Sequence, residues 1–239
     1  MCSPNCIAFV ERALTSDDVT GKRIIEVGSH NVNGSARQSI EVLRPASYIG
    51  VDVNAGPGVD FVCDAAQLLD NFEPASFDVV LSTEMVEHVR DWRVAFTNMK
   101  RLCAPGGVVT ITTRSPGFGY HAYPHDFWRY EKSDMRLIFS DCAIEILESD
   151  ENEYGVFVMA RRTSAPEIDL TPIALTSILS GNRRANISDK EIQRFLLPLR
   201  AWTTVHSITG RLPKGVREEL IRRRFLRGTG AERECLRAT

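Results

Sequence analysis

Short apolar segments that alternate with helical patterns restrict the fold of this chain more than any other feature. Segments with the β-branched, apolar composition of buried strands lie at residues 21–29, 47–53, 59–65, 77–83 and 108–113. Helical spacing occurs at residues 35–44, 91–103 and 132–142. In the second of these helices, the expected apolar positions are Val94, Phe96, Met99 and Leu102. Because strands that are apolar throughout form parallel sheets covered on both faces, we predict a doubly wound, Rossmann-like α/β fold.

The last two strand-like segments are expected to run in opposite directions. Residues 143–149 and 154–162 have the composition of strands, and only residues 150–153 connect them. A parallel crossover needs a dozen or more residues, so this short connection predicts an antiparallel hairpin.

Glycines and carboxylates follow the predicted strands where such sheets bind ligands. Gly28 ends the first strand, and Gly34 lies in the loop before the first helix. A glycine lets the backbone approach a ligand without a Cβ clash. Asp52 ends the second strand, where a carboxylate can accept both ribose hydroxyls of a nucleoside. Asp64 ends the third strand and residues 82–84 end the fourth, so one shared edge of the sheet is expected to hold a nucleoside-like cofactor.

Together, these segments resemble the class I S-adenosylmethionine-dependent methyltransferases. They read IIEVGSHNVNGS, YIGVDV, FVCDAAQL, FDVVLSTEMVEHVRDW and LCAPGGVVTITT, and they span roughly residues 22–162. The likeness is strongest to the group called type 11 methyltransferase domains. It implies a mostly parallel, seven-stranded sheet with a reversed last strand, and S-adenosylmethionine as the cofactor.

The resemblance also implies which residues contact that cofactor. The methionine end would lie on Glu26, Gly28 and Ser29; the ribose on Asp52, with Val53 beside it; the adenine on Asp64 and Ala65; and the methyl-donor side on Ser82, Thr83 and Glu84. The chain departs from the family in the first loop, where polar residues separate Gly28 from Gly34. Asn31 in that loop is a further candidate contact.

Histidines near the predicted site are the candidate bases. His88 follows a glutamate in a pair common in that group, and it either acts as a base or packs beneath the cofactor. The aromatic-rich segment 115–130 directly follows the fifth predicted strand. We interpret it as a substrate wall, with His121 or His125 as general base and Asp126 orienting it. The alternative is a lid that packs on the domain without a catalytic residue.

The three histidines favour O-methylation, because a hydroxyl acceptor must lose its proton. The predicted acceptor is a hydroxyl on a sugar, a glycan or another small metabolite. The alternatives are N-methylation, methylation of RNA, and a non-catalytic protein that binds S-adenosylmethionine. The poor glycine fingerprint disfavours an NAD-dependent oxidoreductase. No ligand cluster in the sequence requires a metal, although His121, His125 and Asp126 could form part of one.

Charge divides the chain into two unequal parts. Residues 183–239 hold 14 Lys+Arg and 6 Asp+Glu, a balance of +8, whereas residues 1–182 hold 15 and 25, a balance of −10. We predict a methyltransferase domain over residues 1–163, followed over 164–239 by a linker and a basic helical extension. The acidic domain argues against a nucleic-acid partner. The helices at 188–208, interrupted at Pro198, and at 213–227 would cap the domain, form a homodimer contact, or lie on a membrane surface.

Segments that would direct the chain into or across a membrane are not evident. The sequence contains no run of 18 apolar residues and no secretory pattern at its N-terminus, so we expect a cytoplasmic protein. Its cysteines form no CxxC pair, and Cys63, Cys103 and Cys142 lie in apolar stretches as expected of core residues.

Overall fold

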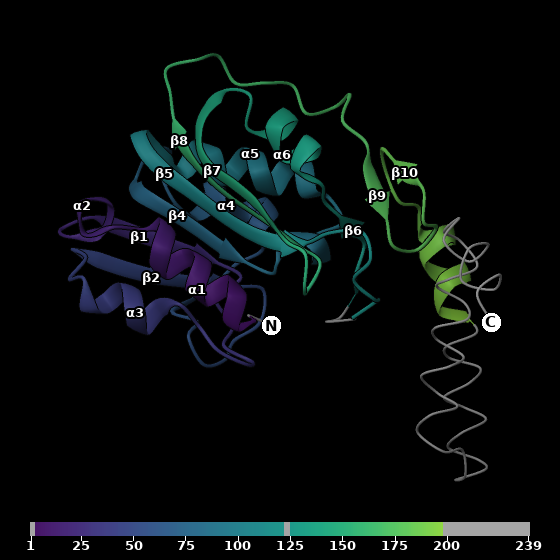
Figure 1. The fold of residues 1–239 in the computed structure, drawn as a ribbon, viewed down its shortest axis with the longest axis horizontal. Helices are drawn as coiled ribbons and strands as arrows, with labels where there is room; N and C mark the ends of the chain where they lie inside the picture. Colours follow the sequence, from purple (N-terminus) through teal and green to yellow (C-terminus); the bar gives the residue numbers. More distant parts are fainter. Residues whose placement is uncertain (1–2, 122–124, 198–239) are drawn as a thin grey trace, which may run out of the picture.

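A seven-stranded sheet with helices on both faces forms the centre of the protein (Figure 1). The computed structural model describes residues 3–121 and 125–197. The strand order is β3-β2-β1-β4-β5-β8-β7. The strands are β1 (Arg23–Val27), β2 (Ser47–Asp52), β3 (Phe61–Val62), β4 (Phe77–Thr83), β5 (Cys103–Arg114), β7 (Cys142–Asp150) and β8 (Gly155–Arg162). Pairs from β3 to β5 are parallel, while β8 is antiparallel to β5 and β7, so the predicted fold class with its reversed strand is confirmed.

The two faces of the sheet are covered by different helices, because the side chains of each strand alternate between the faces. Ile24 of β1 packs into a cluster with residues of α1 (Pro4–Ala13), α2 (Ser16–Val19) and α3 (Arg37–Val42). Ile25 and Val27 pack on the opposite face with residues of α4 (Leu68–Asn71), α5 (Trp92–Leu102) and α6 (Lys132–Ile138). Among the described residues, no helix is long and apolar enough to span a membrane.

The buried side of helix α5 was only partly predictable from the sequence. Its buried positions include Trp92, Ala95, Phe96 and Met99, which share one side of a helix with 3.6 residues per turn. Of the four apolar positions named from the sequence, Val94 is 44% exposed, whereas Phe96, Met99 and Leu102 are buried. The helix begins at Trp92, directly after Asp91. Its buried side therefore starts at Trp92 and not at Val94.

A second, three-stranded sheet packs beside the first and involves residues that we expected to form a linker. Its order is β10-β9-β6, with β6 (Trp128–Arg129), β9 (Leu175–Ser177) and β10 (Arg183–Arg184). Leu170, Ile173 and Leu175 are buried in the main core. The apolar residues within 164–186 therefore tie this segment to the domain. Residues 189–197 are helical, and the predicted helix at 213–227 lies outside the described residues.

Candidate functional site

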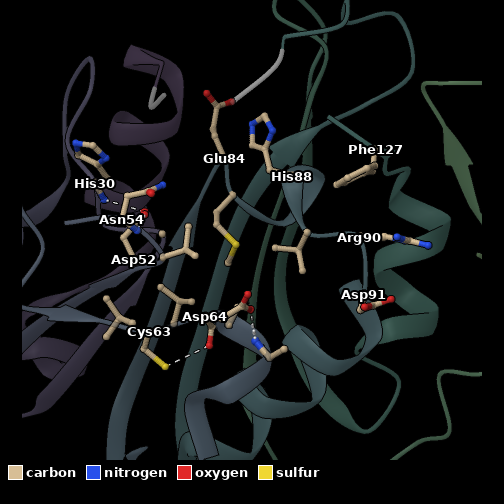
Figure 2. Close-up of a pocket in the computed structure, with 18 of the residues that line it drawn as sticks. His30, Asp52, Asn54, Cys63, Asp64, Glu84, His88, Arg90, Asp91 and Phe127 are labelled. Atoms are coloured by element: carbon tan, nitrogen blue, oxygen red, sulfur yellow. Dashed lines mark hydrogen bonds between the residues drawn. The ribbon is translucent and has the colours of Figure 1, made fainter. Parts of the chain in front are cut away.

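A cavity of about 350 Å³ opens where β1, β2 and β4 end. Figure 2 shows residues that line it, with His30, Asn54 and Asp52 on one side and His88 and Phe127 on the other. Seven of the residues predicted from the sequence line it: Gly28, Asp52, Val53, Asp64, Ala65, Glu84 and His88. The strand ends that carry them are distant in the sequence and adjacent in the sheet. The structure thus has a cavity at the carboxyl edge of the sheet, where the cofactor site is expected.

Gly28 brings the backbone unusually close to a neighbouring loop. Its φ is +86°, in the region that glycine adopts at little cost. A Cβ added there would lie 2.5 Å from Cβ and Cγ of Met85. The Gly28 and Ser29 amides donate to the Val51 carbonyl at 2.8 and 3.0 Å. The turn that follows β1 is therefore held against β2, and its close approach to Met85 shapes the wall of the cavity.

Asp52 presents an oriented carboxylate to the cavity. Its Oδ1 accepts a hydrogen bond from the Asn54 amide at 2.9 Å, and its Oδ2 accepts from the His30 amide at 3.4 Å. Two backbone donors thus fix the carboxyl group without using all its lone pairs. The remaining lone pairs fit the two hydroxyls of a ribose, which is the contact predicted for this position.

Asp64 and Ala65 occupy another side of the same cavity. The Asp64 Oδ1 accepts from the Ala66 amide at 2.8 Å and caps the short 3-10 helix η1 (Ala65–Gln67). This cap places small side chains, Ala65 and Ala66, on the lining next to Cys63. A low, apolar surface of this kind fits a flat aromatic base, so these residues are compatible with the adenine end of S-adenosylmethionine.

Glu84 lies at the end of β4 in a strained conformation. Its φ is +50°, which is uncommon for a residue with a side chain and is concentrated at functional sites. Its carboxylate forms a buried ion pair with Arg114, at 2.6 Å from Oε1 to Nε. Burial and the nearby Glu87 raise the pKa of Glu84, while Arg114 lowers it. The ion pair directs the carboxylate toward β5, so the strained backbone is what faces the cavity mouth.

Five predicted cofactor residues do not line the cavity. Glu26 points to the opposite face of the sheet, where its Oε2 accepts from the Tyr48 hydroxyl at 2.7 Å. Ser29, Ser82 and Thr83 are buried beside the cavity rather than on its surface. The exposed Asn31 turns back on its own loop, where its Oδ1 accepts from the Gly34 amide at 2.9 Å. The strand-end positions were identifiable from the sequence, but the direction of each side chain was not.

Burial raises the pKa of Glu26 from 4.5 to about 7, although the Tyr48 hydroxyl opposes that shift. A carboxyl group whose pKa is raised by folding favours the folded state at low pH, and that stability is lost as the pH rises from 4.5 through about 7. We therefore expect Glu26→Gln, which keeps an acceptor for Tyr48, to raise the free energy of unfolding by about 3 kcal/mol at pH 8 and to have little effect at pH 4. Urea unfolding at both values measures this. Parallel pH profiles for the two proteins would contradict it.

Two histidines, two carboxylates and an arginine form a buried network next to the cavity. The His121 ring lies between Asp126, at 2.9 Å from Nδ1 to Oδ2, and Glu87, at 3.7 Å from Nε2 to Oε1. Arg129 holds both oxygens of Asp126 at 2.6 Å. His88 meets the His121 ring edge-on, with 4.7 Å between ring centroids. The aromatic-rich segment is thus joined to the end of β4 by charge as well as by packing.

The charges in this network determine its protonation. Burial lowers the pKa of His121, but Asp126 and Glu87 outweigh burial and raise it to about 9. Burial opposes ionisation of Asp126, yet Arg129 and His121 lower its pKa to about 2. Although burial acts in the other direction, His121 and His88 hold the pKa of Glu87 below its usual range. An imidazole paired with two carboxylates retains its proton, so in this arrangement His121 is a poor general base.

His125 is placed differently from His121. Its half-buried ring lies 5.7 Å from the ring of Phe127, which lines the cavity. Among the described residues, His125 forms no ion pair with a carboxylate. Its carbonyl oxygen lies 2.6 Å from Nδ1 of His88. Of the predicted bases, His88 therefore lies on the cavity, His125 packs near Phe127 without a carboxylate partner among the described residues, and His121 lies within the charged network.

Several residues on the cavity were not predicted. They include His30, Asn54, Met85, Val89, Arg90, Asp91 and Phe127. Most belong to loops that follow a strand, where residue type alone gives little indication of orientation. The Met85–Asp91 stretch was predictable in part, because it directly follows the fourth strand. Within it, η2 (Val86–His88) turns His88 toward the cavity and Glu87 into the core.

The family to which this fold and site belong follows from comparison with known proteins. The sequence profile of a methyltransferase domain family matches residues 3–141, more than half of the chain. The chain belongs to this family. The predicted class I methyltransferase domain and S-adenosylmethionine as its cofactor are thereby confirmed.

Relatives with related names match parts of this methyltransferase domain. A probable phthiotriol/phenolphthiotriol dimycocerosates methyltransferase of Mycobacterium ulcerans is 38% identical over 42% of this chain and 43% of its own. A fatty-acid O-methyltransferase of Mycolicibacterium smegmatis is 33% identical over 54% of this chain and 46% of its own. The matches therefore span about half the length of these curated relatives.

A solved structure supports the fold. A 1,6-didemethyltoxoflavin-N1-methyltransferase of Burkholderia thailandensis, with bound S-adenosylhomocysteine, has a TM-score of 0.53 and 15% identity. The match covers 66% of this chain and 78% of that one. At this identity, the likeness concerns the arrangement of the sheet and helices.

Proposed function

We propose that the protein transfers the methyl group of S-adenosylmethionine to a hydroxyl oxygen of a small metabolite, sugar or glycan. The observation that carries this proposal is the imidazole of His125, which no described carboxylate pairs and whose ring lies 5.7 Å from that of Phe127, a residue that lines the cavity with Asp52 and His88. A hydroxyl becomes a good nucleophile only as its proton leaves, and an imidazole nitrogen can accept that proton. Two curated relatives carry O-methyltransferase in their names, which supports the same assignment.

In this reaction the protein has to align the acceptor hydroxyl with the methyl group and to remove the hydroxyl proton. S-adenosylmethionine supplies a methyl group on a positively charged sulfur. The acceptor oxygen forms a bond to the methyl carbon, the S–C bond breaks with its electron pair staying on sulfur, and the hydroxyl proton passes to His125. Asp52 would hold the ribose, and the Gly28 turn with the strained Glu84 backbone would bound the place of the methyl-donor end.

Transfer of labelled methyl groups into a fractionated cell extract tests the proposal. We expect label in a carbohydrate, lipid or small-metabolite fraction, attached to oxygen. Label attached to nitrogen, or label in RNA, would overturn O-methylation of a small acceptor while leaving the methyltransferase assignment intact. If S-adenosylmethionine binds and no fraction is labelled, the proposed activity is wrong for the acceptors present.

The base assignment predicts a separate effect of His125→Ala. We expect kcat to fall by about 100-fold, at the lower end for loss of a general base, because water can still accept the proton slowly. The dissociation constant of S-adenosylmethionine should stay within about twofold, since Asp52 and Gly28 are untouched. Steady-state kinetics with the labelled acceptor and calorimetry of cofactor binding measure the two quantities. Equal losses in both would remove His125 as the base.

A further inference from the structure

Three side chains bring one carboxylate oxygen and two imidazole nitrogens to a single point beside the cavity. Glu87, His88 and His121 each offer one ligand atom, and these atoms lie within 4.8 Å of one another. Oε1 of Glu87 is 3.7 Å from Nε2 of His121 and 4.0 Å from Nε2 of His88. These separations are too long for direct hydrogen bonds. The three groups therefore point to a common space and do not hydrogen-bond to one another across it.

Both imidazoles are oriented by groups on their far side. Nδ1 of His88 lies 2.6 Å from the His125 carbonyl oxygen, which can only accept, so this nitrogen carries the hydrogen. Nδ1 of His121 lies 2.9 Å from the Asp126 carboxylate, whose oxygens both accept hydrogen bonds from Arg129. Each ring thus directs Nε2 toward Glu87. Metal-binding histidines characteristically have a carbonyl or carboxylate on the other ring nitrogen in this way.

The hydrogen bonding of the Glu87 carboxylate is a second, independent observation at this point. The residue is fully buried, and its Oε2 accepts from the Thr113 hydroxyl at 2.8 Å. Its Oε1 is buried without a hydrogen bond from any described residue. A buried carboxylate oxygen left without a donor is costly, and a cation bound to it would offset that cost.

We propose that Glu87, His88 and His121 bind a divalent transition-metal ion at this point, with an open coordination position toward the cofactor cavity. In a tetrahedral site with bonds of about 2.1 Å, ligand atoms are about 3.4 Å apart, so the observed spacing needs only a small closure. Two imidazoles and a carboxylate favour ions such as Zn²⁺, Co²⁺ or Fe²⁺ over Mg²⁺.

Because His88 lines the cavity, an ion bound to it would be placed to act on the acceptor. This role of the ion rests on the proposed methyl transfer to a hydroxyl. An ion held there would bind the acceptor's oxygen, orient it toward the methyl-donor end, and make its proton easier to lose. Among small metabolites, acceptors with two adjacent oxygens would then be favoured, because they can chelate one ion.

Metal binding is measured on the full chain without any acceptor. The protein is stripped with a chelator and titrated with Co²⁺, followed by visible absorption and by calorimetry, and Zn²⁺ is titrated in parallel. We expect one Co²⁺ per chain, with the intense absorption of a four- or five-coordinate ion, displaced by Zn²⁺. Binding of S-adenosylmethionine is measured on the same sample, so that failure of the metal site is distinguished from failure of the proposed function.

Glu87→Gln keeps an acceptor for Thr113 but removes the charge, and it should weaken Co²⁺ binding at least tenfold. Glu73→Gln removes an exposed carboxylate elsewhere and should leave metal binding unchanged. A wild-type protein that binds S-adenosylmethionine but no Co²⁺ or Zn²⁺ overturns the proposal, whether or not the variant folds. Equal Co²⁺ affinity of the wild type and Glu87→Gln overturns it as well.

Discussion

Replacing Asp52 by alanine is expected to weaken S-adenosylmethionine binding by about 1000-fold, because two hydrogen bonds from ribose hydroxyls to a charged acceptor are lost. The Asp52 carboxylate is already oriented by the amides of His30 and Asn54, so the free protein spends little conformational entropy in placing it. Isothermal titration calorimetry gives the dissociation constant directly and needs no acceptor. The measurement therefore tests the cofactor site independently of the unidentified acceptor.

Two further variants separate the ribose contact from disturbance of the loop. Asp52→Asn retains one oxygen that can accept from the Asn54 amide, so it should preserve the loop and still lose most of the affinity. Asp70→Ala removes an exposed carboxylate from α4 and should change the affinity less than twofold. If Asp52→Ala binds S-adenosylmethionine within about threefold of the wild type, the ribose does not lie on Asp52 and the orientation proposed for the cofactor is wrong.

The central strands were predictable because burial on both faces of the sheet leaves a strong signal in the sequence. The segment Ile24–Val27 has apolar side chains on both faces of the sheet and is followed by a glycine. It forms part of β1. The hairpin of β7 and β8 was predictable from the length of its connection alone. The fold of residues 168–187 was not, because β9 and β10 are too short to show a period, and their pairing with β6 depends on contacts across the chain.

The site was predictable only as far as the backbone determines it. Asp52, Asp64 and Glu84 follow strands that end at one edge of the sheet, and they line the cavity. Glu26 lies one residue before the end of β1. Because side chains alternate along a strand, it points to the other face, where its carboxylate accepts a hydrogen bond from the Tyr48 hydroxyl. The contact of His121 with Glu87 joins residues 34 positions apart, through a segment whose composition suggested an aromatic wall. Residue types alone could place these groups near one another but could not show that Asp126 and Arg129 fix their charge.

The charged network predicts that Arg129→Met will be strongly destabilising. Arg129 is 1% exposed and its two terminal nitrogens pair with both oxygens of the fully buried Asp126. Removing one partner of a buried ion pair leaves the other charge without compensation, which costs about 3–5 kcal/mol. The melting temperature should therefore fall by roughly 6–20 °C in a chain of this size. Arg101→Met is the matched control, since its ion pair with Glu167 is exposed and should contribute less than about 1 kcal/mol.

The same cause predicts that a second substitution restores part of the loss. Asp126→Leu combined with Arg129→Met removes the charge that the single substitution leaves behind, so the double variant should be more stable than Arg129→Met alone. Thermal unfolding followed by circular dichroism compares the four proteins of this cycle. If Arg129→Met is no less stable than Arg101→Met, the buried pair does not hold the aromatic-rich segment in place. A double variant less stable than either single one would instead assign the loss to the contacts of Arg129 with the Phe118 and Gly119 carbonyls, which anchor the same segment independently of Asp126.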